Sequence, residues 1–375
     1  MGRITRTYIT SRNSLSLLAI LCSSLILVVS LFSKIFIIHY PLATTIMVGS
    51  ITAIVFWTIH ILWIELFVTL CLSLLIAFLS VVLYQNQLEN IHHSFWLKYF
   101  LSSQCLIGWM LVMFVMATII HWLDIFKRVA VSRTKYTWLA VGFGLSGLLV
   151  RWYESYLMGQ EIGHVPISNL YEVFILFMII TALVYLWYEK KLEIRNLGAL
   201  ILPIVVIAGL FMIWYGTTRK SYLIVPLSPS LQSYWMKIHV PANFVGYGCF
   251  SAAAMSGVAW IIKDKGWIKA LPTLQSLETL IYKLISTGFL FFTLATILGA
   301  LWAADAWGSY WQWDPKETWS LIVWLNYAAW LHACLINNVS HKILSWWAII
   351  GLFITLFAFL GVNILLSGLH SYGRL

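Results

Sequence analysis

A short stretch near the carboxyl end of the chain gathers aromatic side chains in a way that suggests ligand binding. Residues 307–324 read WGSYWQWDPKETWSLIVW, so five tryptophans lie close together between two apolar runs. Aromatic belts form where a protein crosses the headgroup level of a membrane, but five tryptophans in one loop exceed what anchoring needs. Four of them are candidates for a binding platform: Trp307, Trp311, Trp313 and Trp319. Their flat apolar faces favour a planar ligand such as a porphyrin, with an interfacial belt as the alternative.

Histidines are the second set of residues with useful chemistry, because neutral imidazole is a common ligand of haem iron. His239 lies in KIHVP, just before an apolar run, and His370 lies in GLHSYG, just after the last one. If both emerge beside the tryptophans, they can ligate iron from the two sides of a haem. For either histidine alone, a wetted interfacial side chain is the alternative.

Other histidines have less defined roles. His332 lies about 13 residues into an apolar run, roughly 20 Å from its outer end at 1.5 Å per residue. A buried titratable group inside a membrane span indicates function, and an inner haem ligand and an interhelical hydrogen bond are both compatible with it. His60 and His121 lie near predicted helix ends, where wetted or snorkelling side chains are expected. His164 is either a wetted loop residue or part of a pocket.

Polar residues beside the tryptophans predict a helix start rather than a catalytic group. Asp314, Pro315 and Glu317 have the spacing of a capping box with proline at the first helical position. The segment 168–172 has a similar pattern. A firm cap would hold the tryptophans in place, so Asp314 is counted with the haem contacts. Four cations of this region can pair with haem carboxylates or with membrane lipid: Lys316, Arg219, Lys220 and Arg374.

The elements that must position these residues are membrane helices. The 375 residues are 61% hydrophobic and only 10% charged, against about 25% charged in a soluble domain. Long apolar runs predict an all-α, polytopic integral membrane protein, because a helix satisfies its own backbone in lipid. About 11 transmembrane helices are predicted, with the division of 42–84 least defined: 14–38, 42–62, 64–84, 97–121, 137–153, 170–188, 197–215, 240–262, 281–302, 319–337 and 343–368. The five cysteines lie in or beside these runs without a CxxC pair, which favours apolar packing over disulfides or zinc.

Positive charge sets the orientation. Most of the 23 Lys and Arg residues fall in alternate loops, which predicts a cytoplasmic N-terminus and an extracytoplasmic C-terminus. The Trp-rich loop, the loops 154–169 and 216–239 and the C-terminal tail then share the outer face. The net charge of +10 is explained by these orientation signals, so no nucleic-acid partner is predicted.

The motifs resemble a known family. WGSYWQWDPKETW resembles the tryptophan-rich WWD signature of haem-handling proteins in cytochrome c maturation. Its DPKET continuation is similar to the CcsA (ResC) branch of the two-component System II cytochrome c synthase. GHVPISNLYE, LQSYWMKIHV and GVNILLSGLHSYG are similar to the same family in order and spacing. The resemblance makes 137–375 a WWD-type, haem-handling cytochrome c assembly domain in the membrane, preceded by an N-terminal four-helix membrane region, 1–136.

The resemblance implies a role in c-type cytochrome biogenesis. Haem b would be exported from the cytoplasmic side and presented at the outer face for attachment to the CxxCH motif of apocytochrome c. Carried over to this sequence, His239 and His370 would be the outer axial ligands, and His332 one ligand of an inner haem site. The chain would be a subunit of a holocytochrome c synthase, a haem lyase, acting with a CcsB (ResB)-like membrane partner. Whether the chain catalyses attachment by itself stays open.

Two other functions were weighed against this one. A haem-handling component of the System I route shares the chemistry, but the DPKET sequence and the chain length argue against it. A secondary transporter of a hydrophobic solute would show inverted repeats with broken helices, and the sequence has no such internal symmetry. The expected location is the bacterial inner (cytoplasmic) membrane, with the thylakoid membrane as the alternative.

Overall fold

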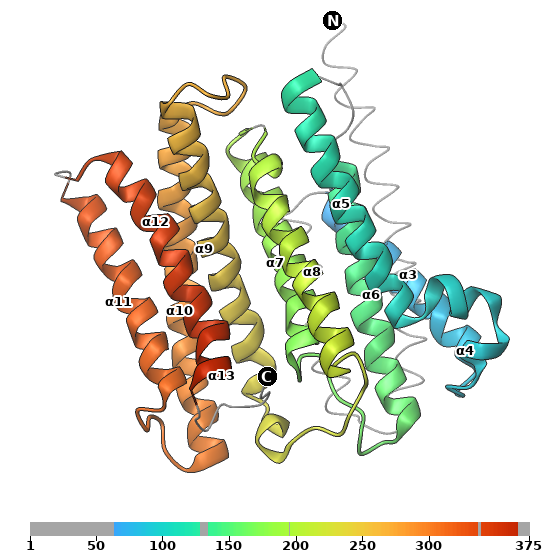
Figure 1. Ribbon diagram of the computed structural model, residues 1–375. Coiled ribbons are helices and arrows are strands. Elements are labelled where there is room, and N and C mark those ends of the chain that lie inside the picture. The colour runs from blue at the N-terminus through green and yellow to red at the C-terminus, as the bar shows by residue number, and fades with distance from the viewer. Residues whose placement is uncertain (1–63, 128–133, 195, 337–338, 367–375) are drawn as a thin grey trace, which may run out of the picture.

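The computed structural model describes residues 64–127, 134–194, 196–336 and 339–366, and these residues form helices joined by loops, without any strand. Figure 1 shows the long helices standing side by side, roughly along one direction. The elements are α3 (Ile64–Tyr84), α4 (Asn90–His93), η1 (Leu97–Leu101), α5 (Ser103–Lys127), α6 (Thr134–Met158), α7 (Leu170–Lys191), α8 (Gly198–Arg219), η2 (Pro229–Gln232), α9 (Met236–Asp264), α10 (Leu274–Trp307), α11 (Pro315–Leu335), α12 (His341–Leu356), η3 (Phe357–Gly361) and α13 (Val362–Leu365). Of the short turns, η1 and η3 are π-helical and η2 is a 3-10 turn.

The predicted fold class is confirmed. Seven of the described helices are long and apolar enough to cross a membrane, namely α3, α5, α7, α8, α9, α10 and α12 with its extension η3. α6 and α11 are also long but carry more polar side chains. These helices lie where the third to eleventh spans were predicted, whereas 14–38 and 42–62 lie outside the described residues. The total of about 11 spans and the orientation across the membrane stay predictions.

One predicted span is displaced along the chain. The span predicted at 97–121 is instead the π-helical turn η1 followed by α5, which begins at Ser103 and ends at Lys127. Ser102 has extended backbone angles and ends η1. The N–H and hydroxyl of Ser103 donate to the buried carboxylate of Glu154 at 2.9 and 2.5 Å. This polar contact with α6 fixes the start of α5, and hydropathy cannot report it because the apolar run continues through the break.

α9 is the centre of the bundle because small residues let its neighbours approach closely. It packs against α7, α10 and α12. A side chain at Gly248 would meet Thr181 of α7, and a Cβ at Gly257 would lie 2.7 Å from the carbonyl oxygen of Ser345 in α12. In lipid, helices associate by such close packing rather than by a hydrophobic driving force. α9 is therefore held firmly by its neighbours. His239 lies in its first turn.

The predicted gathering of loops at one end is confirmed. Figure 1 shows the α6–α7, α8–α9 and α10–α11 connections together at the lower end, where α13 also ends. Residues of the α6–α7 and α8–α9 connections, the start of α11 and α13 line one cavity at this end: Ser168, Asn169, Leu231, Lys316 and Asn363. The candidate site is built there.

Candidate functional site

The loop between α10 and α11 is held at both ends by helix caps. α10 ends at Trp307, and Gly308 follows with a φ of 80°, a left-handed conformation that glycine adopts without strain. The predicted capping box of α11 is confirmed. The Asp314 carboxylate accepts from the N–H of Lys316 at 3.1 Å, and Glu317 Oε2 accepts from the N–H of Asp314 at 3.2 Å. The cap therefore fixes where the loop tryptophans lie.

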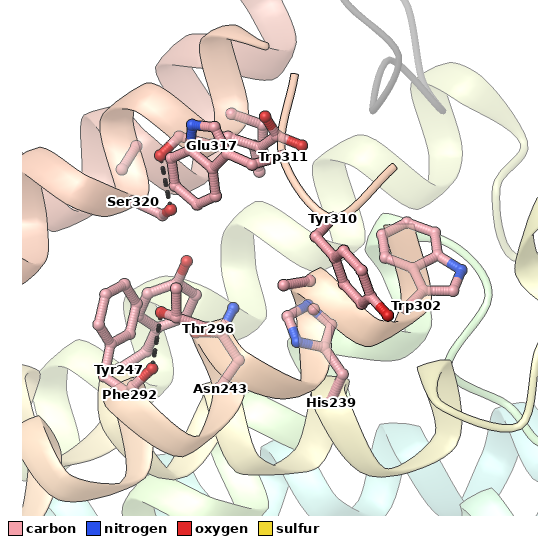
Figure 2. Close-up of a pocket in the computed structure, with 14 residues that line it drawn as sticks. His239, Asn243, Tyr247, Phe292, Thr296, Trp302, Tyr310, Trp311, Glu317 and Ser320 are labelled. Carbon is pink, nitrogen blue, oxygen red and sulfur yellow. Dashed lines mark hydrogen bonds between the residues drawn. The ribbon is translucent and has the colours of Figure 1, made fainter. Parts of the chain in front are cut away.

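Two cavities open beside this loop and share a wall. The α11 cavity, of about 110 Å³, lies between α9, α10 and α11, and the α7 cavity, of about 180 Å³, lies between α7, α8, α9 and η3. Figure 2 shows the α11 cavity, with Trp311 and Glu317 across from Tyr247, Asn243 and His239. Five residues line both cavities: His239, Asn243, Tyr247, Trp302 and Lys316.

His239 lies in the first turn of α9, at the wall between the cavities, and its ring is held from three sides. Its Nδ1 donates to the carbonyl oxygen of Ala295 at 2.7 Å, which leaves the lone pair on Nε2. The ring stacks on Trp302 at 6.0 Å between centroids and 23° between planes. A Cβ at Gly299 would lie 2.8 Å from His239 Cε1, so this glycine makes room for the ring. A histidine that ligates a metal is commonly oriented in this way by its other nitrogen.

The four platform tryptophans occupy different positions. Trp311 lines the α11 cavity. The ring of Trp313 meets the ring of Trp311 edge-on, with 5.9 Å between ring centroids, and Trp313 is 69% exposed. Trp307 and Trp319 line neither of the two cavities. Trp319 instead packs against Phe357 of η3, with 4.3 Å between ring centroids. One of the four is therefore placed to contact a ligand in these cavities.

The tryptophan with the largest share in the site is Trp302, which sequence reasoning passed over as part of a span. It lines both cavities, stacks on His239 and lies 4.9 Å from Trp307. Its Nε1 donates to the carbonyl oxygen of Ser230 at 2.8 Å, which ties η2 to α10. The available signal was an indole close to the outer end of a span, where its N–H needs a partner.

Lys316 brings a positive charge to the shared wall. Its Nζ donates to the carbonyl oxygen of Phe359 at 2.9 Å and to Asn363 Oδ1 at 3.1 Å. An ammonium group has three donors, so one remains for a ligand. Burial lowers the pKa of Lys316 to about 8, although the neighbouring Asp314 raises it. When protonated, Lys316 can pair with an anionic group in either cavity.

A buried ion pair supports the far wall of the α7 cavity. Arg151 of α6 donates through Nε to Glu172 Oε1 of α7 at 2.7 Å, and both side chains are almost completely buried. The guanidinium also donates to the carbonyl oxygens of Tyr222 and Leu223 at 2.8 and 3.5 Å. Glu172 Oε2 accepts from the N–H and hydroxyl of Ser168. This network holds the α8–α9 connection, which precedes His239. The sequence shows the charged residues but does not indicate that they contact one another.

Two other histidines, His121 and His164, are buried, whereas His60 lies outside the described residues. His121 is 1% exposed and its Nε2 lies 3.1 Å from the hydroxyl of Tyr185, so the wetted or snorkelling interpretation is wrong. The reason is that α5 is helical from Ser103 through Lys127, so His121 lies inside the helix rather than at its end. His164 is buried by local hydrogen bonds to Ile162 and Ser168 and lines neither of the two cavities.

The two remaining candidate ligands do not join His239 in the described structure. His332 is exposed in the last turn of α11 rather than buried, because this face of α11 packs against no described helix. It lies at the opposite end of α11 from the cap. His370 falls outside the described residues. The described residues contain no group of three metal-binding side chains, but haem iron takes only two axial ligands from protein.

The chain matches the family model described as "Cytochrome C assembly protein" over residues 167–370. Three relatives are named "Cytochrome c biogenesis protein CcsA". That of Chlamydomonas reinhardtii is 35% identical over 60% of this chain and 64% of its own length. That of Chlorella vulgaris is 31% identical over 64% and 92%, and that of Synechococcus sp. (strain CC9902) is 34% identical over 60% and 81%.

A solved structure shares the fold. "Cytochrome c Heme Lyase CcmF" superposes with a TM-score of 0.53 over 68% of this chain and 46% of its own length. Its identity of 16% is too low to carry more than the fold. The family model covers more than half of the chain, and it includes the α7 cavity, His239 and the Trp-rich loop. The chain therefore belongs to the cytochrome c assembly protein family, among the CcsA proteins of cytochrome c biogenesis.

Proposed function

We propose that this membrane protein binds haem at the end where its loops gather and presents it for covalent attachment to apocytochrome c. The observation that carries the proposal is the geometry of His239. Its Nδ1 is committed to the Ala295 carbonyl, so Nε2 holds the lone pair that iron requires, at the wall between the two cavities. Haem is the cargo of this site, and it would supply the vinyl groups to which cysteine thiols are joined.

The neighbouring residues have distinct parts in this function. His239 is an axial ligand, and His370, outside the described residues, is the second. Trp302 and Trp311 supply apolar faces for the porphyrin ring. Lys316 pairs with a haem carboxylate through its remaining donor. Trp307, Trp313, Asp314 and Trp319 act indirectly, by shaping the loop and its cap.

The exposed position of His332 supports a role for a partner. A histidine on an outward face of a membrane helix can reach a second protein, which would supply the other ligand of an inner haem site. We infer a CcsB (ResB)-like membrane partner for this position, and haem transport from the inner to the outer site. The relatives come from a cyanobacterium and from green algae, so the bacterial inner membrane and the thylakoid membrane are both compatible with this function.

The test is the absorption spectrum of the purified protein together with its partner subunit. The wild-type protein should show a Soret band, and His239→Ala should lose most of it while its level in the membrane is unchanged. Added imidazole should restore part of the band, because a free ligand can occupy an emptied axial position. His92→Ala, which changes an exposed histidine outside the site, is the matched control. A wild-type protein without a Soret band, or full haem retention in His239→Ala, would refute the assignment.

A further inference from the structure

Only one of the two carboxylate oxygens of Glu317, Oε2, takes part in the cap of α11. Oε2 accepts from the backbone N–H groups of Gln312 at 2.7 Å and Asp314 at 3.2 Å. These two bonds close the loop onto the helix and explain why a glutamate follows the proline. A carboxylate has two oxygens, and the cap needs one of them.

The second oxygen, Oε1, is buried without a hydrogen-bond partner among the described residues. The side chain of Glu317 is 7% exposed and lines the α11 cavity, across from Asn243 and Tyr247 in Figure 2. Buried acceptors are almost always paired, and a charged one is the most costly to leave alone. A cavity wall with such an acceptor is suited to a ligand that brings a donor.

The chemistry of the two substrates decides which of them brings that donor. Haem has carboxylates and an apolar ring, and the ammonium group of Lys316, beside Glu317, can form ion pairs with the carboxylates. A carboxylate oxygen would repel these groups. An apocytochrome segment offers donors, namely cysteine S–H and backbone N–H groups.

We propose that Glu317 Oε1 accepts a hydrogen bond from the apocytochrome segment, so that the α11 cavity is the side of the site from which the peptide enters. Lys316 and Glu317, which are adjacent in the chain, thus contact different substrates. The Lys316 ammonium pairs with a haem carboxylate, and the Glu317 carboxylate accepts a hydrogen bond from the peptide. This inference rests on the proposed function. It gives the helix cap of α11 a second, substrate-contacting role.

The experiment uses the protein purified with its partner and loaded with haem, and a labelled synthetic peptide that contains CxxCH. Glu317→Gln is the informative variant, because the amide oxygen can keep both cap bonds while an NH₂ group replaces Oε1. Peptide affinity should fall roughly 10- to 100-fold, the range expected for loss of a hydrogen bond to a charged group. The Soret absorbance per protein should be unchanged. His92→Ala, which changes an exposed histidine outside the site, is the control and should bind peptide normally.

The outcomes separate this inference from the proposed function. Peptide affinity within twofold of wild type in Glu317→Gln would overturn the inference, and so would a fall in haem content with peptide affinity intact. Absence of haem from the wild-type protein would instead refute the proposed function. If Glu317→Gln does not accumulate, S-methylated and backbone N-methylated peptides with the wild-type protein remove the donors from the other side. Unchanged affinity of both methylated peptides would then overturn the inference.

A second peptide identifies the donor. With AxxAH in place of CxxCH, the penalty of Glu317→Gln should vanish if the thiol is the donor and persist if the donor is a backbone N–H. Such a double-mutant comparison isolates the pairwise contact from general effects on binding. Either result supports the contact and assigns it to one group.

Discussion

Two connections border the candidate site, and they are held in place in opposite ways. The α10–α11 loop is fixed by its own neighbours, through Gly308 at one end and the Asp314–Glu317 capping box at the other. The α8–α9 connection is fixed from a distance, by Arg151, which lies 71 residues before the carbonyl it binds at Tyr222. Both connections place a tryptophan or histidine at the same cavities. The difference separates what a local sequence motif can specify from what only the assembled bundle can.

The largest effect is expected when the distant support is broken. Arg151→Met leaves the Glu172 carboxylate buried without its cation and should destabilise the protein by about 3–5 kcal/mol. The thermal unfolding of the detergent-solubilised protein measures this loss. Arg151→Met combined with Glu172→Met removes both charges and should cost less than the sum of the two single changes. Additive losses would show that the two side chains act independently, against the arrangement described.

A smaller and more specific effect, on haem content, is expected when the space around the His239 ring is reduced. Alanine normally stabilises a helix relative to glycine by about 1 kcal/mol. Gly299→Ala should instead lower haem content several-fold, because the new Cβ would lie 2.8 Å from His239 Cε1 and displace the ring. The Soret absorbance per folded molecule is the measurement. Gly108→Ala is the matched control, since a Cβ at that position meets no atom within 4 Å. Equal haem content in both variants would remove Gly299 from the site.

The smallest effect is expected at the local support. Asp314→Ala should cost about 0.5–2 kcal/mol through the lost cap, while Asp314→Asn should cost little, because asparagine is a good N-cap residue. Melting temperatures of the three proteins give the comparison. If asparagine proves as damaging as alanine, the charge of Asp314 matters apart from capping, and the α10–α11 loop is less local than its hydrogen bonds indicate.

The sequence was sufficient wherever structure depends on near neighbours. The span predicted at 170–188 agrees closely with α7, because its apolar length and the Asn169 cap define it. The capping box at Asp314 follows from residue types at fixed spacing. The gathering of loops at one end follows from counting helices.

Residue patterns failed where a contact joins distant segments. The start of α5 depends on Ser103 meeting Glu154, and the room around His239 depends on Gly299. The exposure of His332 depends on which face of α11 meets other helices. None of these contacts leaves a periodic signal, because each is decided by which helices become neighbours.

The π-helical turn η3 has a consequence for the end of the chain. A π-turn adds one residue to a helical turn, and one residue corresponds to about 100° of rotation. The residues of α13, Val362–Leu365, are therefore out of phase with α12. This phase change brings Asn363 to Lys316, and Asn363 and Lys316 both donate to the carbonyl oxygen of Phe359. Without the extra residue, Asn363 would point in a different direction and would not reach Lys316.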